Sequence, residues 1–166
     1  MAASPQKKAG RADARRKLYR EYRQSVRDLL ADAQVRSMRR FVQHGHVSCY
    51  QHCRRVAFLS YRVCRRLGMD SRAAARGGML HDMFLYDWHQ KSPYPQLHAF
   101  HHPAVALQNA RRAFPLTDRE QDIIRKHMWP LTPAFPRYRE SFVVSLMDKY
   151  AALWETAALH RRRKRR

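Results

Sequence analysis

Residues 71–82 read Ser-Arg-Ala-Ala-Ala-Arg-Gly-Gly-Met-Leu-His-Asp. Ser71 is a good helix N-cap and the alanines favour helix, so the stretch predicts a helix that ends near His81 and Asp82. Neighbouring side chains on a helix diverge by about 100°, so His81 and Asp82 can face one centre only at a helix end or by straddling an ion. Gly77 and Gly78 lie one turn earlier and predict either close approach by another element or a simple break in the helix.

Around this stretch, apolar residues recur mostly at the spacing of helices. Residues 1–16 are polar and basic and are expected to be mobile, and 86–100 contain two prolines without a period and predict a loop. No strand alternation persists, so we expect an all-α fold, a single bundle of about six helices. The other expected helices cover residues 18–38, 48–67 (stopped by Gly68), 103–114 (opened by Pro103), 117–129 (with a Thr117–Glu120 capping box) and 138–159, the last being the most apolar and therefore the most buried.

The charge of the chain is strongly positive and unevenly distributed. The 166 residues carry a net charge of +21, of which +8 lies in residues 1–40, +7 in 41–160 and +6 in 161–166. We therefore divide the chain into a basic extension with a first helix (1–40), a domain (41–160) and a basic tail (161–166). Basic ends favour an anionic partner such as nucleic acid, phospholipid or a phosphorylated substrate, and solvated ends without a partner are an equal alternative.

The three cysteines, at 49, 53 and 64, form no CxxC motif and argue against a disulfide framework. No apolar run is long enough for a membrane span and the N-terminus lacks an apolar signal stretch, so we expect a cytoplasmic protein. Cys49 and Cys53 lie near His44 and His46, and a structural zinc site is conceivable, but buried cysteines that act as small apolar residues are the favoured interpretation.

Ten histidines are many for this length, and several lie where they would face a core. His52 shares an apolar stripe with residues 56, 59, 63 and 67, so its ring needs a buried hydrogen-bond acceptor or a metal. His102 precedes Pro103 at the expected start of a helix. His127 falls in the last turn of another helix, where a protonated ring would also suit the helix dipole. Asp148 lies in the most apolar segment, where it is either a buried ligand or part of a polar face.

The order His52, His81-Asp82, His102, His127, Asp148, with each group on a separate helix, resembles the HD superfamily of metal-dependent phosphohydrolases, and most closely its small stand-alone bacterial members. The resemblance covers residues from about 41 to 158 and includes the segments His52-Cys-Arg-Arg-Val-Ala, Ile-Ile-Arg-Lys-His127 and Asp148-Lys149. It implies a first divalent metal held by His52, His81, Asp82 and Asp148. If the site is binuclear, Asp82 would bridge to a second metal held by His102 and His127. His101 adjoins His102, and the proline that follows favours His102 as the ligand.

Such a ligand set suits iron, manganese, zinc or nickel better than magnesium. The expected reaction is hydrolysis of a phosphoester in a nucleotide-like or other small phosphorylated substrate by a metal-activated hydroxide. The expected catalytic residues are Asp82 and Lys149, and the expected substrate-binding residues are Arg76, Lys126, Arg137 and Arg139.

Several families of this superfamily continue the His-Asp pair with Gly-Lys, whereas Met83-Phe84 follows here, which argues against a cyclic-dinucleotide phosphodiesterase. Asp87-Trp88-His89 could line the pocket or be an ordinary polar loop. The rival hypothesis is a catalytically inactive helical module of the same type that binds nucleic acid through its basic termini.

Overall fold

The computed structural model describes residues 5–90 and 98–163, and helices dominate it. A short antiparallel hairpin of β1 (Val42–His44) and β2 (Val47–Ser48) is the sheet found in this part of the chain. The prediction of an all-α fold is confirmed. The helical elements are α1 (Pro5–Ser25), α2 (Arg27–Ala31), α3 (Ala33–Ser37), the 3-10 turn η1 (Met38–Arg40), α4 (Cys49–Arg66), α5 (Ser71–Leu80), α6 (His98–Ala113), α7 (Asp118–Lys126) and α8 (Arg139–Arg163).

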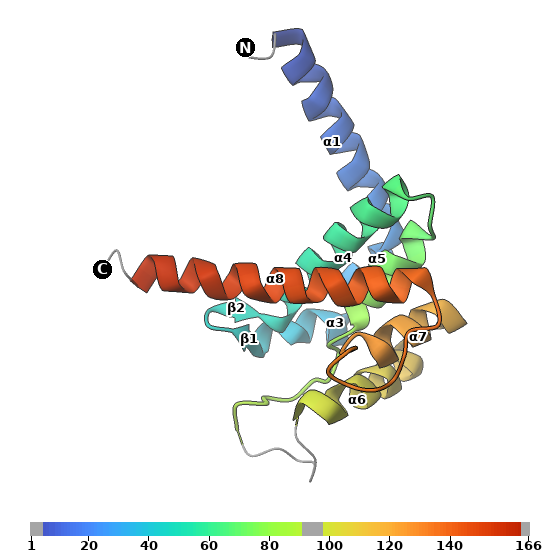
Figure 1. The fold of residues 1–166 in the computed structure, drawn as a ribbon, viewed down its shortest axis with the longest axis vertical. Coiled ribbons are helices and arrows are strands. Elements are labelled where there is room, and N and C mark those ends of the chain that lie inside the picture. Colours follow the sequence, from blue (N-terminus) through green and yellow to red (C-terminus); the bar gives the residue numbers. More distant parts are fainter. Residues whose placement is uncertain (1–4, 91–97, 164–166) are drawn as a thin grey trace.

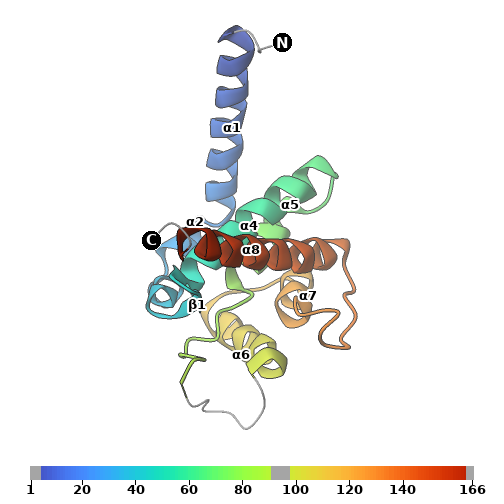
Figure 2. The same cartoon turned by 60° about the vertical axis from the view of Figure 1, so that its left-hand side comes forward.

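The centre of the molecule is formed by α4, α5 and α8, with α6 and α7 packed on one side (Figure 1). Two helices extend beyond this body. The N-terminal part of α1 projects away from it in both views (Figures 1 and 2), and the C-terminal end of α8 reaches past the hairpin in Figure 1. The six metal-ligand candidates lie on or directly after α4, α5, α6, α7 and α8, within the body that these helices form.

The N-terminal region differs from the sequence prediction in two ways. Residues 5–16, expected to be mobile, belong to α1, and the helix expected over 18–38 is divided into α1, α2 and α3. Asp32 has extended backbone angles (φ −72°, ψ 140°), and its side chain accepts a hydrogen bond from the Val35 amide at 2.9 Å. Asp32 is thus an N-cap inside the expected helix, where short polar side chains compete with helical hydrogen bonding.

The connection from α4 to α5 follows the predicted signals closely. Gly68 has φ +64° directly after α4, as expected of a glycine that terminates a helix. The N-cap of α5 is Asp70 and not Ser71, because the Asp70 carboxylate accepts from the Ala73 amide at 2.9 Å. The expected cap was therefore one residue late.

The glycine pair of α5 marks close packing and not a break. A Cβ at Gly77 would lie 2.6 Å from Ile123 Cγ2 on α7, and one at Gly78 would lie 3.1 Å from the backbone Cα of Ala57 on α4. α5 continues through both glycines to Leu80. Their missing side chains let α4 and α7 approach the end of α5, which carries His81 and Asp82.

Both helices after the loop deviate at their ends. α6 begins at His98, so Pro103 lies inside the helix and not at its first position. Most of the loop expected over 86–100 falls outside the described residues or precedes α6. α7 has the predicted Thr117–Glu120 capping box but ends at Lys126, with His127 as C-cap, and not near Trp129.

The prediction that the last helix is the most buried one is wrong for half of its surface. Val144 and Ala151 on its inner face are fully buried, but Leu146, Tyr150, Leu153 and Trp154 on its outer face are exposed. α8 therefore covers the core with one side and presents an apolar side to solvent.

Candidate metal centre

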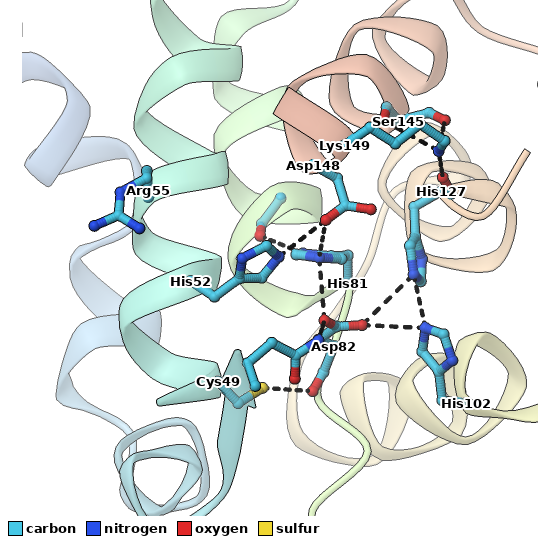
Figure 3. Close-up of polar contacts among 12 residues, drawn as sticks. Cys49, His52, Arg55, His81, Asp82, His102, His127, Ser145, Asp148 and Lys149 are labelled. Atoms are coloured by element: carbon cyan, nitrogen blue, oxygen red, sulfur yellow. Dashed lines mark hydrogen bonds and ion pairs between the residues drawn. The ribbon is translucent and has the colours of Figure 1, made fainter. Parts of the chain in front are cut away.

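Six side chains predicted as ligands converge between the helices (Figure 3). Ligand atoms of His52, His81 and Asp148 lie within 4.8 Å of one another, and so do those of His81, Asp82 and His127. His102 joins the second group through its Nε2, which is 3.2 Å from Asp82 Oδ1. The structure thus brings together residues that are up to 96 positions apart in the chain.

His52 is fully buried on α4 and is held by two carboxylates of α8. Its Nε2 lies 2.9 Å from Asp148 Oδ1, and its Nδ1 lies 3.0 Å from Glu155 Oε2. Glu155 in turn pairs with Arg55, which lies about one turn after His52 on α4. A carboxylate behind the ring orients the imidazole and makes its other nitrogen a better ligand.

His81 and Asp82 share the centre because they lie at the C-terminus of α5. His81 is the C-cap, and its Nδ1 donates to the Gly78 carbonyl at 2.8 Å. Its Nε2 then points to Asp82 Oδ2 at 3.4 Å and to Asp148 Oδ1 at 3.6 Å. The chain leaves the helix directly afterwards, which turns Asp82 toward the same point.

The Asp82 carboxylate lies between two groups of imidazoles. Oδ2 faces His81 and accepts a hydrogen bond of 2.7 Å from Gln43 Nε2, whereas Oδ1 faces His102 at 3.2 Å and His127 at 3.5 Å. Each oxygen is therefore directed at a different set of nitrogens. This is the arrangement expected of a bridging carboxylate.

His102 and His127 also present Nε2 to the centre. The Nδ1 of His102 donates to the His98 carbonyl at 2.8 Å, and that of His127 donates to the Ile124 carbonyl at 2.9 Å. Since each Nδ1 carries its proton, the two Nε2 atoms, which are only 2.9 Å apart, both present lone pairs in the neutral tautomers. A proton or a cation has to lie near them to offset the repulsion.

The electrostatics of the cluster reflect this crowding. Burial opposes the charged form of His52, but hydrogen bonds to Asp148 and Glu155 outweigh it and raise the pKa of His52 well above its ordinary value. Burial, together with the charges of His81 and His102, lowers the pKa of His127 to about 3. Although burial alone would raise the pKa of Asp82, the neighbouring imidazoles lower it. The cluster therefore favours an ionised carboxylate beside neutral and protonated rings, and positive charge at its centre.

The donor set fits a divalent transition metal. His81 Nε2 and Asp82 Oδ1 are buried, and neither has a hydrogen-bond partner among the residues that the structure describes. Buried polar atoms without a partner are costly, and both atoms point to the common centre. Imidazole nitrogens with carboxylate oxygens suit iron, manganese, zinc and nickel.

The predicted cationic residues are placed less uniformly. Arg76 is buried, and its guanidinium binds Asp28 at 2.6 Å and Glu120 at 2.7 Å, so it joins α2 and α7 to α5 and has its charge balanced by protein. Lys126 pairs with Asp122 on its own helix.

Arg137 and Arg139 are exposed just before and at the start of α8. The guanidinium of Arg137 lies 5.5 Å from the centre of the Tyr138 ring. The structure therefore brings none of these four arginine and lysine side chains into the cluster of ligand atoms, and their roles as substrate-binding residues stay predictions.

Lys149 is tied to the end of α7. Its Nζ donates to the His127 carbonyl at 3.2 Å and to Ser145 Oγ at 2.9 Å, and burial lowers its pKa (Figure 3). The ammonium thus holds the backbone of one candidate ligand from the helix that carries another.

Sequence reasoning missed several groups that support the ligands. Glu155 follows Asp148 by seven residues, a spacing that places both on one helix face, so its role could have been inferred. Gln43 comes from the hairpin, and no pattern in the sequence signals it. The Trp88 ring stacks on His98 with centroids 5.0 Å apart, and His98 stacks on His102 at 4.5 Å, so the segment after Asp82 does reach the site.

Cys49 and Cys53 are buried and free, in keeping with the apolar interpretation. Cys49 Sγ donates to the Asp82 carbonyl at 3.2 Å. His44 is outside the residues whose side chains the structure describes, so a zinc site that includes it stays untested.

Together, the helical fold and the buried cluster of imidazoles and carboxylates define a helical domain with a candidate metal centre. The family model of the HD domain matches residues 49–153, well over half of the chain, and the chain belongs to this family. HD domains are generally metal-dependent hydrolases, and the clustered His and Asp residues are compatible with that chemistry. Neither the curated proteins nor the solved structures yielded a match. No helix in the described part of the chain has the length and apolarity needed to cross a membrane.

Proposed function

We propose that this chain hydrolyses a phosphoester of a nucleotide-like or other small phosphorylated substrate with the help of one or two divalent metals. The observation that supports this most directly is the position of Asp82, whose two oxygens are directed at separate groups of imidazoles. A carboxylate that only stabilised the fold would have no need of three histidines turned toward it.

The ligands divide into two sets that share Asp82. His52, His81, Asp82 and Asp148 would hold a first metal, and His102 and His127 would complete a second site with Asp82. When bound, such a metal lowers the pKa of a coordinated water and stabilises charge on phosphoryl oxygens. Iron, manganese, zinc and nickel are the ions that this donor set favours, and magnesium is disfavoured.

The protein's own contribution is orientation and exclusion of water. Three of the rings have their Nδ1 proton held by backbone carbonyls, so Nε2 faces inward without reorganisation. The side chain of Asp148 retains 14% exposure, whereas those of His81 and Asp82 are almost fully buried. Substrate would therefore approach from the side of Asp148. Asp82 remains the proposed catalytic carboxylate, and Lys149 is better described as a positioning residue for His127.

Metal analysis with a matched pair of variants tests the proposal. Purified protein should retain at least one transition metal per chain and should hydrolyse part of a panel of phosphomonoesters and phosphodiesters. Asp82→Ala should abolish both while leaving the helical circular dichroism largely unchanged. Asp118→Ala is the control, because Asp118 is exposed in the first turn of α7, at the opposite end of that helix from His127. Wild-type protein that binds no metal and has no activity with added divalent ions would overturn the proposal.

A second candidate function, binding of nucleic acid, is favoured by the shape and charge of the N-terminal helix. α1 projects from the body, and its sequence carries eight basic and two acidic residues between Pro5 and Ser25 (Figure 1). Contacts with phosphates would make affinity fall steeply with salt, and deleting residues 1–16 and 161–166 should flatten that dependence. A salt slope that is unchanged by the deletion would contradict this function.

A further inference from the structure

The outer face of α8 is apolar in its middle part, from Leu146 to Trp154. Leu146, Tyr150, Leu153 and Trp154 have exposed fractions of 53–72%. The first three are spaced by four and three residues, so they form one stripe along the helix. Val144 and Ala151 on the inner face are buried as well, so apolar side chains occur on both sides of the helix, which explains why its sequence predicted burial.

The stripe continues beyond the start of α8. Phe135 and Leu131, in the segment before the helix, are exposed by 64% and 56%. The Phe135 ring packs against Phe142 with centroids 5.3 Å apart, and Phe142 against Trp129 at the same separation. A monomeric soluble protein rarely exposes apolar groups that are so continuous, and such patches mark interaction surfaces.

The acidic residues of α8 all lie away from this stripe. Glu140, Asp148 and Glu155 contact Asp70, His52 and Arg55 on the inner side of the helix, and none of them is exposed. The exposed face therefore carries apolar side chains without a carboxylate.

The surroundings of the stripe are basic. Arg139 is exposed at its start, and the guanidinium of Arg55, which also pairs with Glu155, lies 4.5 Å from the centre of the Trp154 ring. The sequence after His160 consists of six basic residues, 161–166. Tyr150 and Trp154 are aromatic residues with a polar end, the type that is enriched at membrane–water interfaces.

We propose that the outer face of α8 docks on an anionic phospholipid surface, with the apolar stripe in the interface and the basic residues on the headgroups. Protein surfaces that combine an apolar stripe, aromatic residues and basic side chains bind anionic membranes through apolar burial and electrostatic attraction. A second copy of the chain would cover the stripe as well, but it would bring another net charge of +21 close to a rim that is already basic. Docking leaves the metal centre accessible from another side, because Asp148 lies on the opposite face of α8.

Co-sedimentation of the full chain with vesicles tests this docking. Vesicles of phosphatidylcholine with about one-third phosphatidylglycerol should bind the protein at physiological salt, and pure phosphatidylcholine vesicles should bind it at least about tenfold more weakly, because the basic rim finds no charge there. The double variant L146S/L153S, which keeps every charge, should also lose about tenfold in affinity for the anionic vesicles, since two leucines no longer leave water. Leu67→Ser is the matched control, because Leu67 is 56% exposed at the end of α4 and should not alter binding.

The possible contrary results are distinct. Equal binding of the double variant and the wild type would mean that charge alone attracts the protein, and absence of wild-type binding would also overturn the proposal. A wild-type dimer in analytical ultracentrifugation that the double variant converts to a monomer, without binding to vesicles, would assign the stripe to a second copy. None of these readouts needs metal or hydrolysis, so Asp82→Ala should bind vesicles like the wild type even if the proposed function fails.

Discussion

Replacing Glu155 by Gln would remove one charge from behind a candidate metal ligand while keeping the shape of the side chain. Glu155 is buried and accepts from His52 Nδ1 at 3.0 Å, and its other oxygen pairs with Arg55. A hydrogen bond to a charged group contributes about 1.5–3 kcal/mol and a neutral one about 0.5–1.5 kcal/mol, so the expected loss is about 1–1.5 kcal/mol. That corresponds to about a tenfold change in affinity, at the lower end of the effects known for residues that support metal ligands.

Titration of the metal-depleted protein should therefore show a Kd for transition metal that is about tenfold higher in Glu155→Gln than in the wild type. Glu140→Gln is the control, because Glu140 is buried on the same helix but accepts from the Asp70 amide, away from the ligands. Unchanged metal affinity in Glu155→Gln, with the fold intact, would refute the reasoning that this carboxylate orients His52.

Three further predictions concern packing, pH and the role of Lys149. Gly77→Ala should lower the free energy of unfolding, measured by urea denaturation, by about 1–2 kcal/mol. The added Cβ would lie 2.6 Å from Ile123 Cγ2, and the cost of this overpacking exceeds the gain in helix propensity. An unchanged or higher stability would contradict the prediction. Asp122 accepts from Ser141 Oγ at 2.7 Å, and although burial opposes it, hydrogen bonds from Lys126 and Ser141 lower its pKa. Because its pKa is lowered, the ionised Asp122 stabilises the fold above the ordinary pKa of 3.8, and this stabilisation is lost as the pH falls below it. Asp122→Asn should therefore lower the free energy of unfolding by about 2 kcal/mol at pH 7 and by progressively less below pH 3.8. A loss of stability that does not depend on pH would contradict this prediction. Lys149→Met should weaken metal binding while Lys149→Arg restores part of it; a fall in kcat with unchanged metal affinity would instead favour the catalytic role.

The six candidate ligands could be selected because their order on successive helices resembles the HD superfamily, whereas no single one of them was decisive by its position alone. The positions of His81 and Asp82 at a helix end, and of His52 at the head of an apolar stripe, are compatible with side chains that point into one centre. What sequence could not give is the support from irregular segments. Gln43 reaches Asp82 from a hairpin with no periodic pattern, and the Lys149 ammonium is bound to backbone carbonyls, which any sequence has.

The errors in the fold have separate physical causes. Asp32 divides the first predicted helix because its side chain competes for an amide, although the apolar spacing continues across it. Pro103 suggested a helix start, but α6 begins five residues earlier. The burial of α8 was overestimated because an apolar composition indicates that burial is favourable but does not identify the surface that covers each face.

The four imidazoles are oriented by two kinds of hydrogen-bond acceptor, and this difference determines which of them a substitution can affect. His81, His102 and His127 are oriented by main-chain oxygens, which no substitution can delete. His52 depends on a side chain instead. Exchanges at residue 155 are therefore a direct route by which natural variation or an engineer could adjust metal preference while leaving the other rings undisturbed.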